Sequence, residues 1–427
     1  MEPPPPSPWR AWSWVPSLYF CQGVPNAVAA SLSVVLFKNL GVANTEIAFY
    51  TSALYLPWVL KPLWSPLVEL FGAKRRWVVL LQCALALAFA GIAAAIPGPD
   101  FLRWTLALLW LLAFCSATHD IAADGFYLLA LPPHQQAAFV GVRSTFFRGS
   151  LIAVKGGLVG LAGWLLAATG DVAHAWTVVF ALLAGWFALG GAYHAWALPR
   201  PAADGPAGRG GPARAGFLEV FTSFAAKPGI GATIAFLLLY RLAEALALKL
   251  VEPFLLDARA AGGLGLTNAQ LGFANGTVGV GALLAGGLLG GWLISRHGLK
   301  RMLWPMLFVM HVPIVVFLLL ALAQPGSLAV VSAALAVEQF GYGFGFTAYM
   351  VYMMLVAEGP HQTAHYAICT GFMAAGLMLP GMAAGWLQEH LGYVNFFAVT
   401  CAATLPSFAA AALLRVDPAY GRKQSEG

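Results

Sequence analysis

Charged side chains are scarce in this sequence. Among its 427 residues, 23 are Lys or Arg and 17 are Asp or Glu, or 9% of the chain, while 60% are hydrophobic. Soluble proteins carry about 25% charged residues, and so few charges cannot cover so apolar a chain. The composition therefore excludes a cytosolic enzyme, and it equally excludes a disordered protein. Five cysteines in a chain of this length also exclude a secreted disulfide scaffold.

Motifs that carry enzymatic chemistry are missing as well. The sequence has no His-Glu-x-x-His, Cys-x-x-Cys or Gly-x-Ser-x-Gly pattern and no phosphate-binding loop. The cysteines have no ligand spacing, so we interpret them as small apolar residues. We therefore expect no enzyme, no cofactor and no metal site.

Long apolar runs make up most of the chain. A helix needs about 20 apolar residues to cross a bilayer, and runs such as Trp77–Ile96 are too unbroken for a membrane barrel strand of about 10 residues. Helices satisfy their own backbone over such runs. We expect an all-α membrane protein with twelve transmembrane helices near 11–37, 44–70, 77–97, 101–131, 136–168, 172–197, 228–256, 267–294, 300–323, 326–357, 361–390 and 392–415.

One stretch interrupts this pattern. Residues 199–216 are rich in Gly, Pro, Ala and Arg and are typical of a flexible linker, and the following residues 217–227 can form an amphipathic helix on the membrane surface. The sequence thus predicts a disordered N-terminal tail (1–10), an N-terminal six-helix bundle (11–198), a cytoplasmic linker with the amphipathic helix (199–227), a C-terminal six-helix bundle (228–415) and a cytoplasmic tail (416–427).

The distribution of Lys and Arg predicts the orientation. With the N-terminus inside, the cytoplasmic segments hold fourteen of the 23 basic residues, the outer segments hold three, and six lie within spans. Positive residues favour the cytoplasmic side, so we expect both termini in the cytoplasm. The net charge of +6 is explained by this topology and gives no reason to expect nucleic acid.

Some charges remain within the predicted spans, where each costs roughly 2.5–3.5 kcal/mol on insertion scales. Asp120 and Asp124 are four residues apart and share a helix face, and Arg143 and Arg148 lie at similar depth in the next span. These four residues can form a network between adjacent helices. The network acts either as a structural or gating latch or in direct contact with substrate or protons.

The second half carries a similar set. Arg241 and Glu244 are three residues apart and can pair within one helix. Glu338 stands alone near the middle of its span, where a carboxyl group is a candidate proton carrier. The alternative is a salt bridge between Glu338 and Arg241 with no role in transport. We assign proton coupling or gating to Asp120, Asp124, Arg143, Arg148, Glu244 and Glu338.

Lys61 has no acidic neighbour close to it in its own span, so it must pair across the bundle or meet an anionic substrate. Gln22 and Asn26 are four residues apart at mid-depth, where their amides suit a sugar or amide group. Aromatic residues near these positions suit the apolar faces of sugar rings. The predicted substrate-binding residues are Gln22, Asn26, Tyr55, Lys61, Arg241, Gln339 and Tyr349.

The two halves contain similar short basic loops, at Ser65–Arg76 and Gly290–Arg301. These loops resemble the loop between the second and third helices of the major facilitator superfamily, repeated in the second half. Two stretches are more specific. Leu56–Glu69, with Lys61, and His119–Gly125, which reads His-Asp-Ile-Ala-Ala-Asp-Gly, resemble motifs of the AmpG-type muropeptide permeases and their acetyl-CoA transporter relatives. His119 departs from the glutamine usual in that motif.

The resemblance implies two pseudo-symmetric six-helix bundles that rock about a central site. It also implies an inner-membrane importer, coupled to protons, of sugar-containing cell-wall fragments or a related amino-sugar compound. We expect a monomer in the lipid bilayer. Lys61, Asp120 and Asp124 match its motifs. Two alternatives stay open: a transporter of another anionic solute, such as a siderophore or an acyl-CoA-like compound, and a transporter-like membrane sensor.

Overall fold

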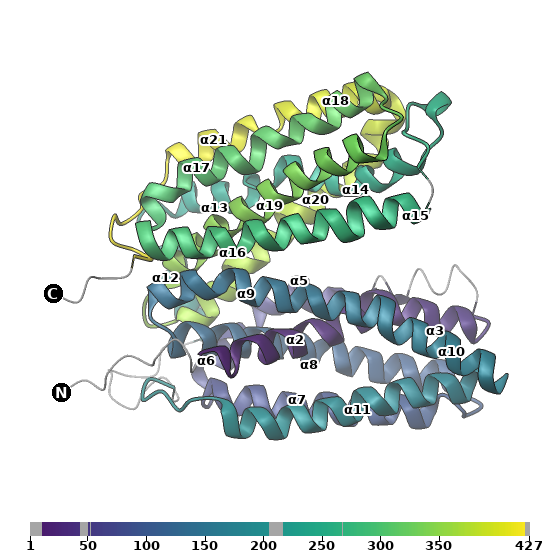
Figure 1. The fold of residues 1–427 in the computed structure, drawn as a ribbon. Helices are drawn as coiled ribbons and strands as arrows, with labels where there is room; N and C mark the ends of the chain where they lie inside the picture. Colours follow the sequence, from purple (N-terminus) through teal and green to yellow (C-terminus); the bar gives the residue numbers. More distant parts are fainter. Residues whose placement is uncertain (1–10, 43–49, 52, 205–216, 267, 423–427) are drawn as a thin grey trace. The chain divides into compact units, whose positions relative to one another are not determined.

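The computed structural model describes residues 11–42, 50–51, 53–204, 217–266 and 268–422, and the regular elements within these ranges are all helices (Figure 1). The predicted N-terminal tail 1–10 lies outside the described residues. Eight helices in the described part are long and apolar enough to cross a membrane individually. The other predicted spans contain helices that are broken into shorter pieces or joined end to end, so the helices follow the twelve predicted ranges.

Contacts between Cα atoms divide the chain into two compact units. Unit 1 comprises Met1–Pro132, Arg143–Val220 and Gly359–Ile368, and unit 2 comprises Pro133–Val142, Phe221–Glu358 and Cys369–Gly427. The division is not made at a single linker, because α9 and α20 each contribute residues to both units. The domain boundaries predicted from the sequence remain a prediction.

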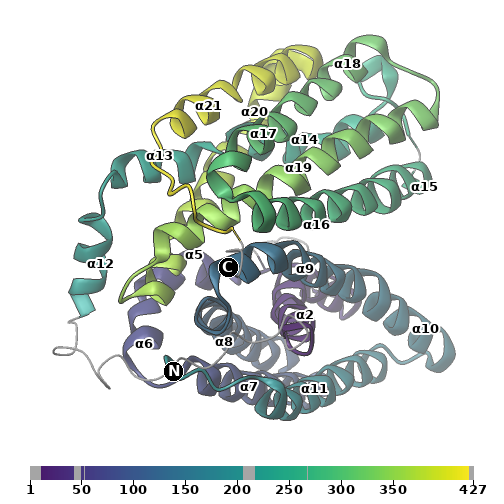
Figure 2. The ribbon, with the colours of Figure 1, turned by 60° about the vertical axis from the view of Figure 1, so that its left-hand side comes forward.

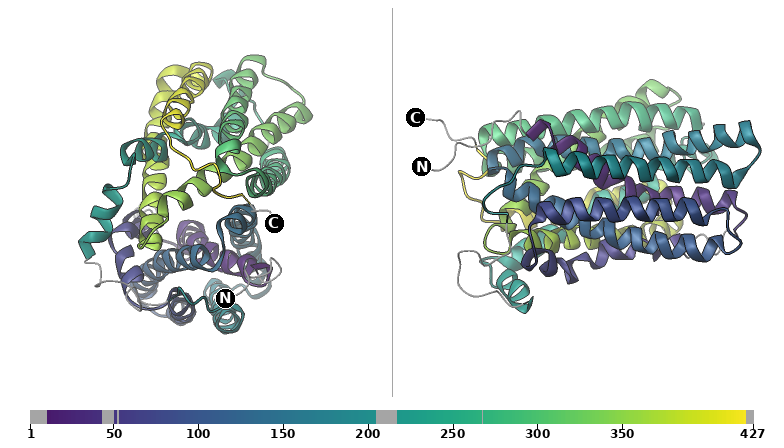
Figure 3. Two further views of the ribbon diagram at one scale, coloured as in Figure 1. Left: turned by 90° about the vertical axis from the view of Figure 1, so that its left-hand side faces the viewer. Right: turned by 90° about the horizontal axis from the view of Figure 1, so that it is seen from below.

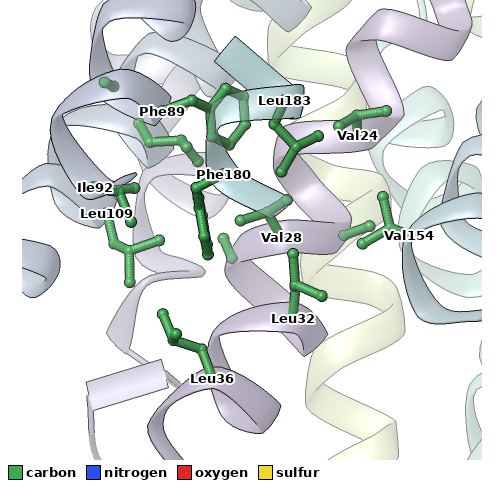
Figure 4. Packing of buried hydrophobic residues seen from close by; sticks show 14 of the residues in the cluster. Val24, Val28, Leu32, Leu36, Phe89, Ile92, Leu109, Val154, Phe180 and Leu183 are labelled. Carbon is green, nitrogen blue, oxygen red and sulfur yellow. The ribbon is translucent and has the colours of Figure 1, made fainter. Parts of the chain in front are cut away.

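Unit 1 is built around long helices whose axes are roughly aligned (Figure 3), with α7 packed against both α8 and α11. Val24, Val28, Leu32 and Leu36 line one side of the first span and face Phe89, Phe180 and Leu183 (Figure 4). The elements that form the unit are α2 (Val15–Ala27), η1 (Val28–Leu32), α3 (Ser33–Asn39), α5 (Leu56–Leu60), η2 (Lys61–Leu63), α6 (Ser65–Leu70), α7 (Lys74–Ala95), α8 (Phe101–Ala130), the second half of α9 (Pro133–Ile152), η3 (Ala153–Leu158), α10 (Val159–Thr169) and α11 (Val172–Ala197).

Unit 2 has a separate core around Phe254, Phe317 and Phe397. Its helices α16 and α19 lie side by side (Figure 2). The elements that follow the linker are α12 (Phe217–Ala225), α13 (Ile230–Leu239), α14 (Leu242–Leu256), η4 (Arg259–Ala261), α15 (Asn268–Leu271), η5 (Gly272–Gly279), α16 (Val280–His297), α17 (Leu299–His311), η6 (Val312–Ile314), α18 (Val315–Ala323), α19 (Leu328–Ala357), α20 (Gln362–Ala402) and α21 (Leu405–Ala412). The amphipathic helix predicted within 217–227 corresponds to α12.

Close packing of α16 against α19 depends on glycine. A Cβ atom on Gly343 would overlap the backbone of Leu283, and one on Gly286 would overlap the backbone of Phe340. Small residues let neighbouring helices approach until their backbones touch. By contrast, nothing lies within 4 Å of a Cβ placed on Gly281, so not every glycine in this span serves the contact.

The two similar loops predicted from the sequence share a backbone feature. Gly72 has φ +84° and Gly298 has φ +83°, values that glycine adopts without the steric cost of a Cβ. The glycine is shifted between the copies, because α7 begins two residues after Gly72 whereas α17 begins directly after Gly298. In unit 1 the Glu69 carboxylate accepts hydrogen bonds from Lys74 Nζ at 3.1 Å and from the Ala364 backbone N–H at 3.1 Å.

The beginning of the predicted linker is held in place. The carboxylate of Asp204 accepts hydrogen bonds from the backbone N–H groups of Lys74 at 2.6 Å and Arg75 at 3.0 Å. These are free N–H groups of the first turn of α7, and a carboxylate there satisfies them and complements the helix dipole. A residue about 130 positions away in the sequence thus caps this helix.

Candidate functional site

The carboxylate of Asp120 is the first centre of the candidate site. Lys61 Nζ forms an ion pair with Oδ2, and Gln22 Nε2 donates a hydrogen bond to Oδ1. Lys61 and Gln22 are 7% and 5% exposed. Lys61 therefore pairs across the bundle, which is one of the two outcomes that its sequence context left open.

Asp124 forms a second centre one helical turn along α8. Its Oδ1 accepts hydrogen bonds from the Tyr19 hydroxyl at 2.9 Å and from Arg143 Nη2 at 2.5 Å. The guanidinium of Arg143 also lies over the rings of Tyr19 and Tyr127, 4.3 and 4.9 Å from their centroids. Aromatic faces stabilise a buried cation, so this pair is held in place by more than its charge.

Two buried polar atoms at these centres have no hydrogen-bond partner among the described residues: Gln22 Oε1 and Arg143 Nη1. Buried polar atoms are nearly always paired. An unpaired acceptor and an unpaired charged donor give the centres the capacity to bind a polar or anionic group.

A helix break positions the lysine. α5 ends at Leu60, Lys61 begins the short η2 turn, and Pro62 cannot continue the hydrogen-bond ladder of α5. Transporters often place their binding groups at such discontinuous helices. Asp120 and Asp124 instead lie on the unbroken α8, which fixes their spacing.

Unit 2 contains a separate ion pair, between Arg241 and Glu244. Two parallel hydrogen bonds of 2.7 Å join the guanidinium to the carboxylate. Arg241 Nη2 also donates to the Tyr342 hydroxyl at 3.1 Å, and its guanidinium lies over the Phe346 ring at 4.9 Å. Arg241 stands at the break between α13 and α14, and Glu244 lies in the first turn of α14, where the helix dipole favours a carboxylate.

The other predicted residues of unit 2 are buried or half-buried. Glu338 accepts a hydrogen bond from the neighbouring Gln339 amide at 2.8 Å, and the structure pairs Arg241 with Glu244 rather than with Glu338. Tyr349 stacks on Tyr240 at 4.8 Å and donates its hydroxyl to the Leu237 carbonyl. Its hydroxyl is therefore engaged within the bundle.

The remaining predicted residues lie outside the two carboxylate centres of unit 1. Asn26 is half-buried on α2, and Arg148 is half-buried on α9. Tyr55 is 48% exposed and stacks on Trp58 at 5.6 Å. Of the predicted network of two aspartates and two arginines, the structure shows the Asp124–Arg143 pair, and Asp120 pairs with Lys61.

Sequence reasoning missed the Tyr19 hydroxyl and a group of uncharged polar residues. Gln82 and His194 are fully buried in α7 and α11, in spans that are otherwise almost entirely apolar. The signal that could have found them is this isolation, since the sequence reasoning ranked charged residues and passed over lone amides and imidazoles.

Comparison with known proteins agrees with this fold. The family model described as Major Facilitator Superfamily matches residues 237–427, and the BT1 family model matches residues 22–189. The anhydromuropeptide permease of Escherichia coli K12 is 26% identical over 410 residues, covering 95% of this chain and 80% of that protein. The putative transporter AmpG 1 of Rickettsia prowazekii is 26% identical over 176 residues, covering 41% of this chain and 38% of that protein.

Solved structures show the same architecture. The Escherichia coli fucose:proton symporter FucP (N162A) superimposes with a TM-score of 0.72 at 14% identity, covering 94% of this chain and 98% of that one. The proton:xylose symporter XylE gives a TM-score of 0.62 at 11% identity, covering 97% and 96%. The fold is therefore that of the major facilitator superfamily.

The chain thus has the fold of the major facilitator superfamily, and the relatives that it matches are named as a permease and a transporter. More particularly, it resembles the AmpG-type muropeptide permeases, as its second- and fourth-helix motifs predicted.

Proposed function

We propose that this protein imports an anhydromuropeptide or a related amino-sugar solute across the inner membrane, driven by protons, with both termini in the cytoplasm. The observation that carries the choice of solute is the 26% identity to an anhydromuropeptide permease over 95% of the chain. The half-buried carboxylate of Asp120 and the buried carboxylate of Asp124 support proton coupling, because each is bound to a single cation that a proton can release.

The coupling step uses Asp120 and Asp124. A proton that neutralises Asp120 removes the charge that holds Lys61, and one that neutralises Asp124 does the same for Arg143. The released cation is then free to bind an anionic or strongly polar group of the solute. Gln22 Oε1 accepts from a hydroxyl or acetamido N–H group, and Arg143 Nη1 donates to a carboxylate or carbonyl, since neither atom has a partner in the described part of unit 1.

Uptake into proteoliposomes tests this proposal. Purified protein should accumulate a labelled anhydromuropeptide when the lumen is more alkaline than the bath, and collapse of the proton gradient should abolish accumulation. Asp120→Asn should leave exchange of solute across the membrane but remove accumulation. Asp171→Asn is the matched control, because Asp171 is exposed and only caps α11 by accepting from the His174 N–H at 3.0 Å.

Three results would contradict the proposal. Accumulation that is independent of the proton gradient would rule out proton symport. Uptake of an acyl-CoA or a ferric siderophore by the same vesicles, without uptake of the anhydromuropeptide, would show that the protein is a transporter but that the proposed solute class is wrong. Binding without uptake of any of these compounds would favour a sensor.

A further inference from the structure

A second buried polar cluster lies in unit 1, outside the carboxylate centres. Ser17 Oγ lies 3.0 Å from His194 Nε2, His194 Nδ1 lies 2.9 Å from Gln82 Oε1, and Gln82 Nε2 lies 3.1 Å from His119 Nε2. Gln82, His119 and His194 are each at most 1% exposed. This hydrogen-bond chain, Ser17–His194–Gln82–His119, joins α2, α11, α7 and α8.

The direction of donation along this hydrogen-bond chain follows from the Gln82 amide. The Gln82 amide presents its oxygen to His194 and its nitrogen to His119. An amide oxygen only accepts and an amide nitrogen only donates, which assigns the His194 proton to Nδ1 and leaves His119 Nε2 as an acceptor. His194 Nε2 is then an acceptor for the Ser17 hydroxyl at 3.0 Å, in competition with the Trp14 carbonyl oxygen at 3.2 Å. Both imidazoles are uncharged in this order, and a second proton on His119 would force the Gln82 amide and the His194 tautomer to reverse.

His119 directly precedes Asp120 on α8. Consecutive residues of a helix point about 100° apart, so α8 is held by polar contacts on two faces: His119 bonds toward α7, and Asp120 bonds toward α2 and η2. A helix held on two faces cannot rotate about its axis without losing one set of bonds. The charged or titratable groups around His119 are Asp120 on its own helix and His194 on α11.

We propose that Ser17, His194, Gln82 and His119 are positioning residues that fix the rotation of α8, and so hold Asp120 against Lys61 and Asp124 against Arg143. The part of this inference that concerns transport rests on the proposed function, since the carboxylates must couple transport for their placement to matter. The part that concerns the environment of Asp120 can be tested without any solute.

Amide substitutions at the two histidines provide the test. The side-chain amide of Gln reaches the position of Nε2 in histidine, and that of Asn reaches the position of Nδ1. His119 uses Nε2 toward Gln82, so His119→Gln should preserve the chain and His119→Asn should break it. His194 uses Nδ1 toward Gln82, so the preference should reverse, with His194→Asn preserving the link to α8 and His194→Gln breaking it.

Size-exclusion chromatography first shows that each of the four variants is folded. Two properties of each variant are then measured in lipid vesicles. The first is the pH midpoint of the Asp120 carboxyl band in infrared difference spectra, assigned with Asp120→Asn. The second is the pH profile and turnover of anhydromuropeptide uptake. His119→Asn and His194→Gln, which break the hydrogen-bond chain, should shift the infrared midpoint and lower turnover about tenfold, the scale expected when interacting groups are displaced by a fraction of an ångström. His119→Gln and His194→Asn, which preserve the link between His194, Gln82 and His119, should stay within about twofold of the wild type.

The reversed preference at the two positions decides the outcome. A role limited to filling space would give the same order of Asn and Gln at both positions, and that result would overturn the proposal. An unshifted infrared midpoint in folded His119→Asn would overturn it as well. If the wild-type protein fails to take up anhydromuropeptide but the infrared preferences reverse as expected, the proposed solute is wrong and the positioning role stands.

Discussion

Removal of one partner of the Arg241–Glu244 pair should strongly destabilise unit 2. The pair is joined by two hydrogen bonds of 2.7 Å, and its side chains are 8% and 7% exposed. Glu244→Leu leaves the guanidinium with the Tyr342 hydroxyl and the faces of the Tyr342 and Phe346 rings. A buried charge that loses its partner costs about 3–5 kcal/mol of unfolding free energy, and Arg241→Met should cost a similar amount by stranding the carboxylate.

The double variant separates the cost of a stranded charge from the value of the pair. Arg241→Met combined with Glu244→Leu replaces both charges by apolar side chains of similar volume, and such replacements are often neutral or stabilising. We expect its unfolding free energy to return to within about 1 kcal/mol of the wild type. Equilibrium unfolding in mixed detergent micelles measures all four proteins, and the cycle gives the coupling energy.

Transport by the double variant then reports on function. If the pair serves only the fold, the stable double variant should still take up solute. If Arg241 contacts the solute, stability should return without uptake. Single variants as stable as the wild type, or a double variant whose loss equals the sum of the single losses, would refute the view that Arg241 and Glu244 neutralise each other within unit 2.

Three smaller perturbations test other features of the structure. Asp204→Ala removes the cap on the first turn of α7 and should lower the free energy of unfolding by about 1 kcal/mol, seen as a lower Tm. In Gly343→Ala the new methyl group meets the Leu283 backbone, which should lower the free energy of unfolding by about 1–3 kcal/mol. In Gly281→Ala it meets no atom of the described residues within 4 Å, and this variant should leave the free energy of unfolding unchanged or raise it by up to about 1 kcal/mol. Equal effects of the two variants would argue against the contact between α16 and α19. Burial and the nearby Asp417 charge raise the pKa of Glu358. The folded protein therefore loses stability as pH rises from the ordinary glutamate pKa through the raised one. Glu358→Gln should remove this loss, and Tm measured as a function of pH checks it.

The helices were predictable from the sequence because a membrane span needs about 20 apolar residues, and runs of that length stand out without any tertiary information. Some breaks were visible too, since Pro62 follows Lys61 directly. The break between α13 and α14 carries no such mark, because neither Tyr240 nor Arg241 is a helix breaker. It becomes intelligible only from the pairing of Arg241 with Glu244.

The partners of the predicted residues were less predictable. Asp124 and Arg143 lie on consecutive spans at similar depth, and depth alone suggested their meeting. For Asp120 the sequence offered Arg143 and Arg148 at similar depth, whereas its pairing with Lys61 depends on how α8 packs against η2, 59 residues away in the sequence. Sequence spacing carries no information on such packing. The same limitation hid Gln82, whose role depends on what faces it from two other helices.

The ion pairs have both partners in the same unit, and this limits how a proton can separate them. The four ion pairs of the described residues, Lys61–Asp120, Lys74–Glu69, Arg143–Asp124 and Arg241–Glu244, each lie inside one unit. A movement of either unit as a rigid body therefore leaves every one of these pairs intact. What can separate Lys61 from Asp120 is a proton on the carboxylate or a competing anion on the lysine, and both act on the same pair. Under the proposed function, proton and solute then act on the same ion pair, which is why we expect Asp120→Asn to separate solute exchange from accumulation while the control Asp171→Asn does not.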